Sequence, residues 1–565
     1  MIQIEQTFTT DVLVIGGGGA GVRAALEAEA KGAKTILATK GKLGDSGTTA
    51  FEVAETAGYN AADGCIGTDS PDQHYQDIMK AALGTCDPEV ARVLTEEAPE
   101  SLAELESWGV PFEKKGDRHL VVEGCFGSQP RMHIIKRHSK PILEVLVERL
   151  KSTSVQVLEE VIVVDLVVEG NTCYGALLMD YTGKFILVRA GAVILATGGG
   201  GQLFKLNLNP KDVTADGYAI GLRAGAEIIN MEFMQAGLGL VHPLSNILNC
   251  WVWYLRPRLL NNRGEEFLAK YLPSGVEPLD CMNDKAHHFP FSSRDLSKYI
   301  ETAIIKEINL GNYGPHGGVY IDFRKIDLSK VSSDFQTMWQ TTKSWYKKLG
   351  VDPDEELLEV APFGHAINGG LRVGPNGEST VENLFAVGEV AGGPHGADRL
   401  GGNMILCCQV FGKRAGRAAA EASAGKQGRT SAGSLNSTIK GINEGQGRLN
   451  PMQVKKEIQD LMSANYLVVR NAQGLEALIK KLQGIVVQME TEGFQITSPA
   501  DKVQALECRN MLDTATMMGK AALLREESRG SHYREDFPDT KPEFKKILSF
   551  QLFEQKLIHK TIQTN

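Results

Sequence analysis

A glycine-rich turn close to the N-terminus constrains the fold of this chain more than any other feature. Residues 11–25 read DVLVIGGGGAGVRAA, in which a short apolar run, Val12 to Ile15, precedes the glycines. The run is too short for a buried helix and is rich in β-branched residues, so it predicts a buried strand. Gly16, Gly18 and Gly21 follow at G-x-G-x-x-G spacing, and the alanine-rich segment after them predicts a helix.

This order of strand, glycines and helix is typical of a dinucleotide-binding turn. The first glycine of such a motif allows a tight turn, the second lets the backbone approach a pyrophosphate, and the third lets the helix pack closely on the strand. The N-terminus of the helix adds a positive partial charge next to the phosphates. A glycine-rich turn that binds no nucleotide is the alternative, and the flanking strand and helix argue against it.

The composition is that of an ordinary globular protein and disfavours several partners. A chain of 565 residues exceeds what one core accommodates, so several domains are expected. A net charge of −9 argues against nucleic acid or an anionic membrane as the main partner. The chain has no run of 18 apolar residues, and its first residues lack the basic and apolar regions of a signal peptide. We therefore expect a cytoplasmic protein, attached to a membrane, if at all, through partner subunits.

The nine cysteines are scattered and contain no C-x-x-C pair. Cys407 and Cys408 are adjacent, a spacing at which two thiols do not easily chelate one ion. We expect reduced, mostly buried thiols, no metal site, and no iron–sulfur or haem motif in this chain.

Hydrophobic periodicity predicts alternating strands and helices up to about residue 236, where the regular pattern ends. From there to about 355 the chain is irregular and holds many aromatics and prolines, which indicates an inserted domain. The other predicted elements are strands at 34–38, 154–168, 172–189 and 192–195, and helices at 87–108, 140–152, 214–235, 403–421 and within 450–532.

The end of the second predicted strand bears on the nucleotide. Many dinucleotide sites place Asp or Glu there to bind the ribose hydroxyls, whereas this chain has Thr39 and Lys40. A later strand ends in Ala196-Thr197-Gly198-Gly199, a second glycine cluster. The two clusters fit a long ligand that spans several loops, such as FAD, better than they fit NAD.

Further motifs then follow in order along nearly the whole chain, and together they resemble the flavoprotein subunit of the succinate dehydrogenase and fumarate reductase family, which includes L-aspartate oxidase. The matching segments are TILATK (35–40), WGVPF (108–112), ILATGG (194–199), DGYAIGLRAGAEIINMEF (216–233), SRD (293–295), GHAINGGLRV (364–373), NLFAVGEVAGGPHGADRLGGN (383–403) and ESRGSHYREDFP (527–538).

The resemblance implies that FAD is bound by residues from several loops. The implied cofactor-binding residues are Gly16, Gly18, Gly19, Ala20, Gly21, Thr39, Lys40, Ser46, Gly47, Thr48, Ala196, Thr197, Gly198, Gly199, Asp216, Glu389, Arg399, Asn403 and Ile405. Covalent members of the family attach FAD through the histidine of a Ser-His-Thr motif. Gly47 stands at that position here, so the resemblance implies non-covalent FAD.

The resemblance also implies four catalytic residues. Arg294, in Ser-Arg-Asp, matches the arginine that delivers a proton to the substrate; the alternative is a surface arginine paired with Asp295. His365 and Arg399 match the histidine and arginine that contact a substrate carboxylate, with a structural role or ion pair as the alternative. His242 stands several residues late for the family's Gln-Phe-His-Pro-Thr motif.

One departure concerns substrate specificity. The family's Thr-Glu-x-x-Arg-Gly segment, which binds a second carboxylate, is replaced by CWVWYLRPR at 250–258. Arg256 or Arg258 could restore part of the lost charge. The aromatic residues of this segment suggest a more apolar substrate, with a role in the core of the inserted domain as the alternative.

These observations predict an α/β fold in which a Rossmann-type FAD domain (1–235 and 356–430) is interrupted by an α+β capping domain (236–355) and followed by a C-terminal helical domain (431–565). The expected activity is fumarate-reductase-like hydride transfer between flavin N5 and the C=C or CH–CH bond of an anionic enoate substrate. Rival functions are L-aspartate oxidase, an adenylylsulfate-reductase-like flavoprotein, and a non-catalytic FAD electron-transfer subunit. The expected partner is a separate iron–sulfur or other electron-transfer subunit, because this chain has no cluster motif.

Overall fold

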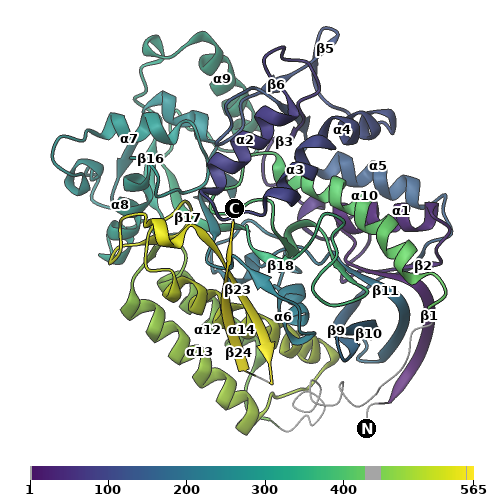
Figure 1. Ribbon diagram of the computed structural model, residues 1–565. Coiled ribbons are helices and arrows are strands. Elements are labelled where there is room, and N and C mark those ends of the chain that lie inside the picture. The colour runs from purple at the N-terminus through teal and green to yellow at the C-terminus, as the bar shows by residue number, and fades with distance from the viewer. Residues whose placement is uncertain (1–2, 427–446, 555, 565) are drawn as a thin grey trace.

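The apolar N-terminal strand lies inside a seven-stranded sheet in the computed structural model of the protein, which describes residues 3–426, 447–554 and 556–564 (Figure 1). β1 (Ile4–Ile15) pairs in parallel with β2 (Thr35–Ala38) and with β11 (Phe185–Leu195). The last four residues of β1 are buried and its first four are exposed, which is why hydropathy predicted only the buried end.

The order of this sheet is β8-β2-β1-β11-β10-β9, and a seventh strand, β19, pairs with β11 in parallel. The remaining bounds are β8 (Gln156–Leu158), β9 (Val161–Glu169), β10 (Thr172–Asp180) and β19 (Leu384–Ala386). The predicted α/β class is confirmed. As predicted, a glycine cluster follows each of two neighbouring strands of the sheet, β1 and β11.

Two long helices pack against each other beside this sheet, α1 (Gly19–Ala30) and α10 (Asn403–Ser423). They approach closely because glycines face the contact: a Cβ at Gly416 would lie 2.4 Å from the carbonyl oxygen of Ala24. α5 (Lys140–Leu150) packs on α1 from another side. The helices predicted at 140–152 and 403–421 are thus confirmed within two residues.

The segment between β2 and α5 forms a small lobe. Its three-stranded sheet has the order β3-β7-β6, with β3 (Thr56–Asn60), β6 (Val121–Val122) and β7 (Met132–Lys136). The predicted helical pair is confirmed as α3 (Pro88–Glu96) and α4 (Ala98–Ser107), preceded by α2 (Pro71–Ala82). A hairpin of β4 (Lys114–Lys115) and β5 (Arg118–His119) projects beside the sheet.

The inserted region is built on a separate five-stranded antiparallel sheet of order β14-β13-β17-β16-β15. Its long central strands are β13 (Met234–His242) and β17 (Leu358–Ile367), so the sheet continues past the predicted boundary at 355. The other elements are β14 (Asn246–Ile247), β15 (Arg258–Leu260), β16 (Val319–Asp322), α7 (Pro278–Lys285), α8 (Lys298–Asn309) and α9 (Ser333–Lys348). These helices gather on one side of the molecule in Figure 1.

The helix predicted at 214–235 is much shorter in the structure. α6 (Asp216–Arg223) ends before Gly225, whose φ of +89° lies outside the helical region, and β12 (Ile228–Ile229) follows. The apolar spacing of this stretch fits a helix. Its later residues instead form β12 and the beginning of the strand that starts at Met234, and these two strands belong to different sheets.

The C-terminal region is helical only in its first part. α12 (Pro451–Asn465), α13 (Ala472–Glu492) and α14 (Pro499–Leu524) pack on one another, whereas β23 (Lys546–Phe553) and β24 (Lys556–Gln563) form a hairpin. That hairpin joins a sheet of order β20-β18-β12-β23-β24, with β18 (Gly370–Arg372) and β20 (Ala391–Gly392). The three helices confirm the predicted C-terminal helical domain, and the alternation of apolar residues in ILSFQLF explains the hairpin that follows them.

The boundary predicted at 430 and 431 lies outside the described residues. Within the described residues, no helix is long and apolar enough to cross a membrane.

Candidate active site

One long cavity runs from the N-terminal glycine turn to the base of the inserted sheet. It is bounded by the ends of β1 and β2, by the loop that follows β2, by the end of β11, and by the segment leading into α10. Most of the predicted site residues line it: Gly16, Gly18, Gly19, Ala20, Thr39, Lys40, Ser46, Gly47, Thr48, Ala196, Thr197, Gly198, Asp216, His365, Glu389, Arg399 and Ile405.

The three glycines of the turn differ in what a side chain at each position would meet. A Cβ at Gly16 would lie 2.1 Å from the carbonyl oxygen of Ala196, and one at Gly21 would lie 1.9 Å from that of Gly16. Gly18 differs, because a Cβ there would meet only Thr49 Oγ1 at 3.7 Å. Gly16, with a φ of +122°, therefore turns the chain against the end of β11, Gly21 lets the helix pack on the strand, and Gly18 leaves free space in the cavity.

Two further glycines that line the cavity leave the same kind of space. Gly47 and Gly198 have φ values of +79° and +73°, and a Cβ at either would have no protein atom within 4 Å. Side chains at these positions would project into the cavity itself. The cradle thus has room for a ligand that follows the backbone at three places, as a dinucleotide does, and the residues present fit FAD.

Charged groups at the β2 end of the cavity neutralise one another. Lys40 Nζ lies 3.0 Å from Asp216 Oδ2 and 2.7 Å from Glu507 Oε1. Burial opposes the lysine's charge, but the two carboxylates outweigh it, so the pKa of Lys40 is raised. Asp216 occupies the first turn of α6, and its pKa is lowered because Lys40 and a hydrogen bond from Asn510 outweigh burial.

Three predicted cofactor residues support the cradle without lining it. Gly21 is one of them. Gly199 is packed against the carboxylate of Glu389, 2.2 Å from where its Cβ would stand. Asn403 begins α10, and its amide oxygen accepts a hydrogen bond from Asn60 Nδ2 at 2.7 Å. These positions hold neighbouring elements together.

Arg399 is the central charge at the other end of the cavity. Its side chain is buried, and it donates hydrogen bonds from Nε to Gln235 Oε1 at 3.1 Å and from Nη1 to the Leu400 carbonyl at 3.2 Å. No carboxylate of the described residues forms an ion pair with it. A buried guanidinium held only by neutral groups is costly unless an anion completes its shell, so this end is suited to an anionic ligand.

His365 lines the cavity beside this arginine, and its ring is edge-on to Phe289 with centroids 5.2 Å apart. Burial and the charge of Arg399 lower the pKa of His365 to about 3. The imidazole is therefore neutral at neutral pH and can donate one hydrogen bond without adding a charge.

Arg294 lies behind the cavity wall. It donates two hydrogen bonds to Asp398 Oδ2, from Nε at 3.0 Å and from Nη2 at 2.6 Å, and its guanidinium stands over the ring of Phe126. Asp398 is buried, and burial raises its pKa although Arg294 opposes this. Asp295, which the sequence suggested as an alternative partner of Arg294, instead pairs with His288.

His242 also lies outside the cavity lining. It ends β13, and its ring stacks on that of His316 with centroids 3.5 Å apart. When Gln235 is aligned with the glutamine of the family's Gln-Phe-His-Pro-Thr motif, the histidine position falls on Gly237. A Cβ at Gly237 would lie 2.2 Å from the ring of Phe289, so that ring fills the space there.

The segment 250–258 does not reach the cavity either. Trp253 is buried in the core of the inserted region, and Tyr254 stacks on Phe335 at 4.3 Å. Arg256 is exposed, and Arg258 pairs with Asp322. The aromatic residues thus form the core of the cap, and neither arginine restores a charge near Arg399.

The sequence motifs did not reveal several groups at the Arg399 end. Gln235 orients Arg399, and Phe289 and Cys125 line the cavity, with the Phe289 N–H donating to Cys125 Sγ at 3.1 Å. A hydrogen bond from Cys250 lowers the pKa of the Cys125 thiol. Gln235 lies two residues after the recognised MEF segment, at the position where the family's Gln-Phe-His-Pro-Thr motif begins. That position was the one sequence signal that could have identified Gln235.

Comparison with known proteins identifies the family. Residues 11–405 match the family model described as FAD binding domain, and residues 455–559 match that described as fumarate reductase flavoprotein C-term. A chain of the fumarate reductase (CoM/CoB) of Methanothermobacter marburgensis is 34% identical over 561 residues, covering 96% of this chain and 97% of that protein. L-aspartate oxidase of Streptomyces coelicolor is 30% identical over 546 residues, covering 94% of this chain and 89% of that protein.

Solved structures agree with this result. Sdh1 of Mycobacterium smegmatis in complex with UQ1 matches with a TM-score of 0.85 at 27% identity, covering 99% of this chain and 95% of that chain. A quinol-fumarate reductase with menaquinol molecules matches with a TM-score of 0.83 at 26% identity, covering 99% of both chains.

The chain therefore belongs to the family of FAD-dependent flavoproteins that contains fumarate reductase flavoproteins and L-aspartate oxidases. It is an FAD-dependent oxidoreductase of the fumarate reductase type, as the sequence motifs predicted.

Proposed function

We propose that this oxidoreductase interconverts the C=C and CH–CH forms of a substrate that carries one carboxylate against Arg399 and an apolar remainder. The observation that carries the proposal is the buried Arg399 guanidinium, which faces the cavity without a carboxylate partner among the described residues. Bound FAD supplies the redox chemistry, exchanging a hydride with a substrate carbon.

Arg399 and His365 hold and orient the substrate in this proposal. Gln235 fixes the guanidinium from its Nε side, which leaves Nη2 without a hydrogen-bond partner among the described residues and available to a carboxylate. The neutral His365 donates a hydrogen bond to the same anion. Fixing the carboxylate in this way places the neighbouring double bond at a constant position in the cavity.

Arg294 is the proposed proton donor, on the strength of its Ser-Arg-Asp motif. In this structure it is paired with Asp398, the residue next to Arg399 in the chain. The pair can hold a proton at a fixed place behind the cavity wall, where the guanidinium stands over the ring of Phe126. After the transfer, Asp398, which accepts both hydrogen bonds from Arg294, would relay a proton from solvent back to the neutral guanidine.

The apolar remainder of the substrate is proposed from the cavity wall near Arg399. Val53, Ala54, Leu208, Ile247 and Phe289 line that wall and form one apolar cluster with Phe363. Arg399 is the one arginine among the described lining residues. A substrate with a single carboxylate matches this wall better than a four-carbon diacid, whose second carboxylate would need another cation.

FAD is proposed to be non-covalent because Gly47 provides no nucleophile at the attachment position. Acid precipitation of the purified protein should leave all flavin in the supernatant. Yellow colour retained in the washed pellet would contradict this assignment.

The electrons are proposed to come from, or pass to, a separate iron–sulfur or other redox subunit, in a cytoplasmic complex or one attached to a membrane through its other subunits. The relatives named as subunits support this. Full turnover of the isolated chain with NADH alone, and no second protein in native extracts, would contradict it.

The activity itself is tested by steady-state reduction with a chemical electron donor. Fumarate and monocarboxylic enoates are compared in this assay, L-aspartate and sulfite are compared as electron donors with a chemical electron acceptor, and flavin spectra are followed during titration of the oxidised enzyme. Reduction of a monocarboxylic enoate in preference to fumarate is expected. Tight binding and rapid reduction of fumarate would retain the activity but overturn the proposed specificity, and activity with L-aspartate or sulfite alone would overturn the proposal.

A further inference from the structure

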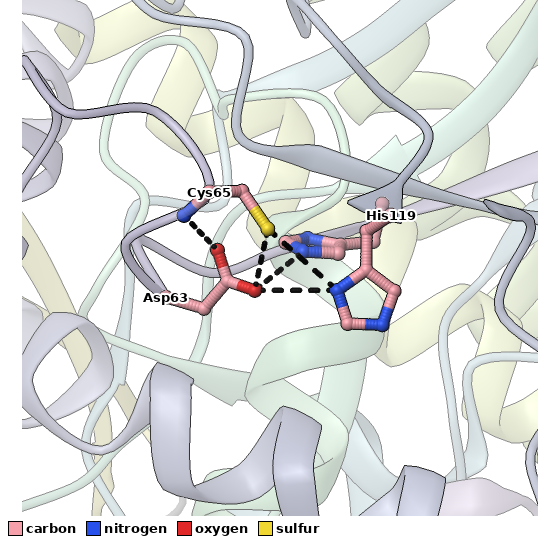
Figure 2. Close-up of side chains that lie close together, drawn as sticks. Asp63, Cys65 and His119 are labelled. Atoms are coloured by element: carbon pink, nitrogen blue, oxygen red, sulfur yellow. Dashed lines mark hydrogen bonds and ion pairs between the residues drawn. The ribbon is translucent and has the colours of Figure 1, made fainter. Parts of the chain in front are cut away.

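A cluster of four potential metal ligands lies in the small lobe, outside the cavity described above. It consists of Asp63 and Cys65, in the loop after β3, His119, at the end of the β4–β5 hairpin, and His133, on β7. We call these four residues the Asp63 cluster. Figure 2 shows the side chains of Asp63, Cys65 and His119 pointing toward one another. None of the four lines the cavity, and none belongs to a motif recognised in the sequence.

The ligand atoms of the cluster are spaced as in a tetrahedral metal site. Asp63 Oδ2 lies 3.1 Å from Cys65 Sγ, 3.3 Å from His119 Nδ1 and 3.2 Å from His133 Nε2. Cys65 Sγ lies 3.7 Å from His119 Nδ1, and all four atoms are within 4.8 Å of one another. Zinc bonds of about 2.0–2.3 Å in tetrahedral geometry separate ligand atoms by roughly 3.3–3.7 Å.

The outer contacts of His133 fix its tautomer. Its Nδ1 faces two carbonyl oxygens, of Arg131 at 3.0 Å and of Tyr59 at 3.3 Å, so Nδ1 carries the hydrogen and donates it. In the neutral ring, Nε2 then presents a lone pair toward Asp63 Oδ2, which in its ionised form also only accepts. A cation between the two atoms satisfies both.

The same reasoning applies to His119. Its Nε2 lies 3.1 Å from Glu106 Oε1, so this nitrogen donates to the carboxylate and Nδ1 is left to face the carboxylate and the thiol of the cluster. Metal-binding histidines commonly donate their other ring hydrogen to a carboxylate or a backbone carbonyl. Both histidines of the cluster have such an outer partner.

From this geometry we propose that the Asp63 cluster binds one Zn²⁺ ion in a closed structural site. One thiolate, two imidazoles and one carboxylate are ligands that zinc accepts, and four protein ligands leave no open position for catalysis. This proposal replaces the expectation from sequence that the chain holds no metal. The signal was hard to recognise, because the ligands come from positions 63 to 133 and only Asp63 and Cys65 are close in sequence.

The position of the site indicates what the ion would stabilise. It would join the 63–65 loop and the β4–β5 hairpin to β7, through ligands from all three. The same lobe supports the cofactor cradle, since Asn60, at the end of β3, donates hydrogen bonds to the Gly401 carbonyl and to Asn403. We therefore expect the ion to stiffen this wall of the cradle without touching the reacting groups.

The test measures metal content and affinity in the full-length, flavin-loaded protein. After metal stripping with a chelator, Zn²⁺ addition and gel filtration, elemental analysis should find one zinc per chain. Cys65→Ser and His119→Gln should each weaken zinc binding at least tenfold. His287→Gln, at an exposed histidine outside the cluster, should bind zinc like the wild type.

Two further measurements keep the proposal falsifiable if those variants fold poorly. Glu106→Gln changes the outer partner of His119 and removes an exposed ion pair with Lys114 but no ligand of the cluster, and it should weaken zinc binding by roughly 10- to 100-fold. Co²⁺ in place of zinc should give a thiolate-to-cobalt charge-transfer band that is lost in Cys65→Ser. A stripped protein that retains no zinc after addition, or variants that bind zinc as the wild type does, would overturn the proposal and leave the four side chains as a hydrogen-bonded cluster without a metal.

Discussion

The two ends of the cavity hold their charges in opposite ways. At the β2 end, Lys40 is neutralised by Asp216 and Glu507, and the space for ligand comes from glycine backbone. At the other end, Arg399 is buried with only an amide oxygen and a carbonyl as partners. A cradle for a cofactor that stays bound can be balanced internally, whereas a site whose anionic ligand enters and leaves must keep a charge unpaired. Substitutions at the β2 end should therefore affect flavin content, and substitutions at the Arg399 end should affect turnover.

The largest effect is expected from Arg294→Gln, which removes the proposed proton donor but no group that lines the cavity. Turnover should fall by about two to four powers of ten, as is typical for loss of a general acid, while FAD and a carboxylate ligand still bind. Steady-state rates and flavin-monitored titration measure the two properties separately. Arg263→Gln, at an exposed arginine of the same region, serves as the control. Turnover within about threefold of the wild type would assign the proton to another residue.

Arg399→Gln should next show what the unpaired charge does. Substrate binding should weaken by roughly 2–5 kcal/mol, because a buried carboxylate would lose its charged partner. Flavin content should stay near that of the wild type. Titration of the oxidised flavin spectrum measures both, and Arg256→Gln and Arg258→Gln are the matched controls because their side chains lie away from the cavity. Weakening by the controls but not by Arg399→Gln would move the anion site to segment 250–258.

The same contrast explains how much of the site the sequence predicted. The cradle depends on glycines at fixed spacing next to a strand, and backbone geometry of that kind is encoded locally, so Gly16, Gly18 and Gly21 could be assigned roles from sequence. The substrate end depends on Gln235 and Phe289, which come from distant segments and meet only through the fold of the cap. Aromatic residues at 250–258 suggested a substrate contact because sequence alone does not distinguish the core of the cap from the cavity wall.

The fold shows the same limit. The strand and helix around the first turn could be predicted because hydrophobic periodicity is continuous there. The stretch 214–235 has helical spacing, yet only its first part is a helix, since Gly225 and the pairing of β12 with β23 override the local pattern. Pairing with a strand more than 300 residues away has no local signal.

The glycine turn offers a test of the cofactor end, with two substitutions that should act differently. Gly18→Val places a side chain in the free space of the cavity, so flavin content should fall at least tenfold while the protein stays folded. Gly21→Ala forces a Cβ against the Gly16 carbonyl at 1.9 Å, so it should lower the melting temperature as well. Absorbance and circular dichroism of the purified proteins measure the two effects. Equal loss of stability in both variants would show that Gly18, like Gly21, is needed for packing within the protein and not for space around the ligand.

The smallest effect concerns Glu389, which lines the cavity and accepts a hydrogen bond from the Ile367 N–H at 3.0 Å. Burial raises its pKa to about 7, against the hydrogen bond and the charge of Arg399. Between its ordinary pKa and this value, the folded protein keeps a proton that the unfolded chain has released. Stability should therefore fall as pH rises through this window, by the linkage of proton binding to folding.

Glu389→Gln removes the titrating group but keeps an acceptor for the Ile367 N–H. On going from about pH 5 to about pH 8, the melting temperature of the flavin-free wild type should fall more than that of the variant, by about 2 °C, which corresponds to about 2 kcal/mol in a chain of 565 residues. Glu389→Asp, which still titrates, should keep the slope. An identical pH dependence in wild type and Glu389→Gln would show that Glu389 is already ionised at pH 5. The cavity around Glu389 would then be hydrated well enough to hold a carboxylate without a charged partner.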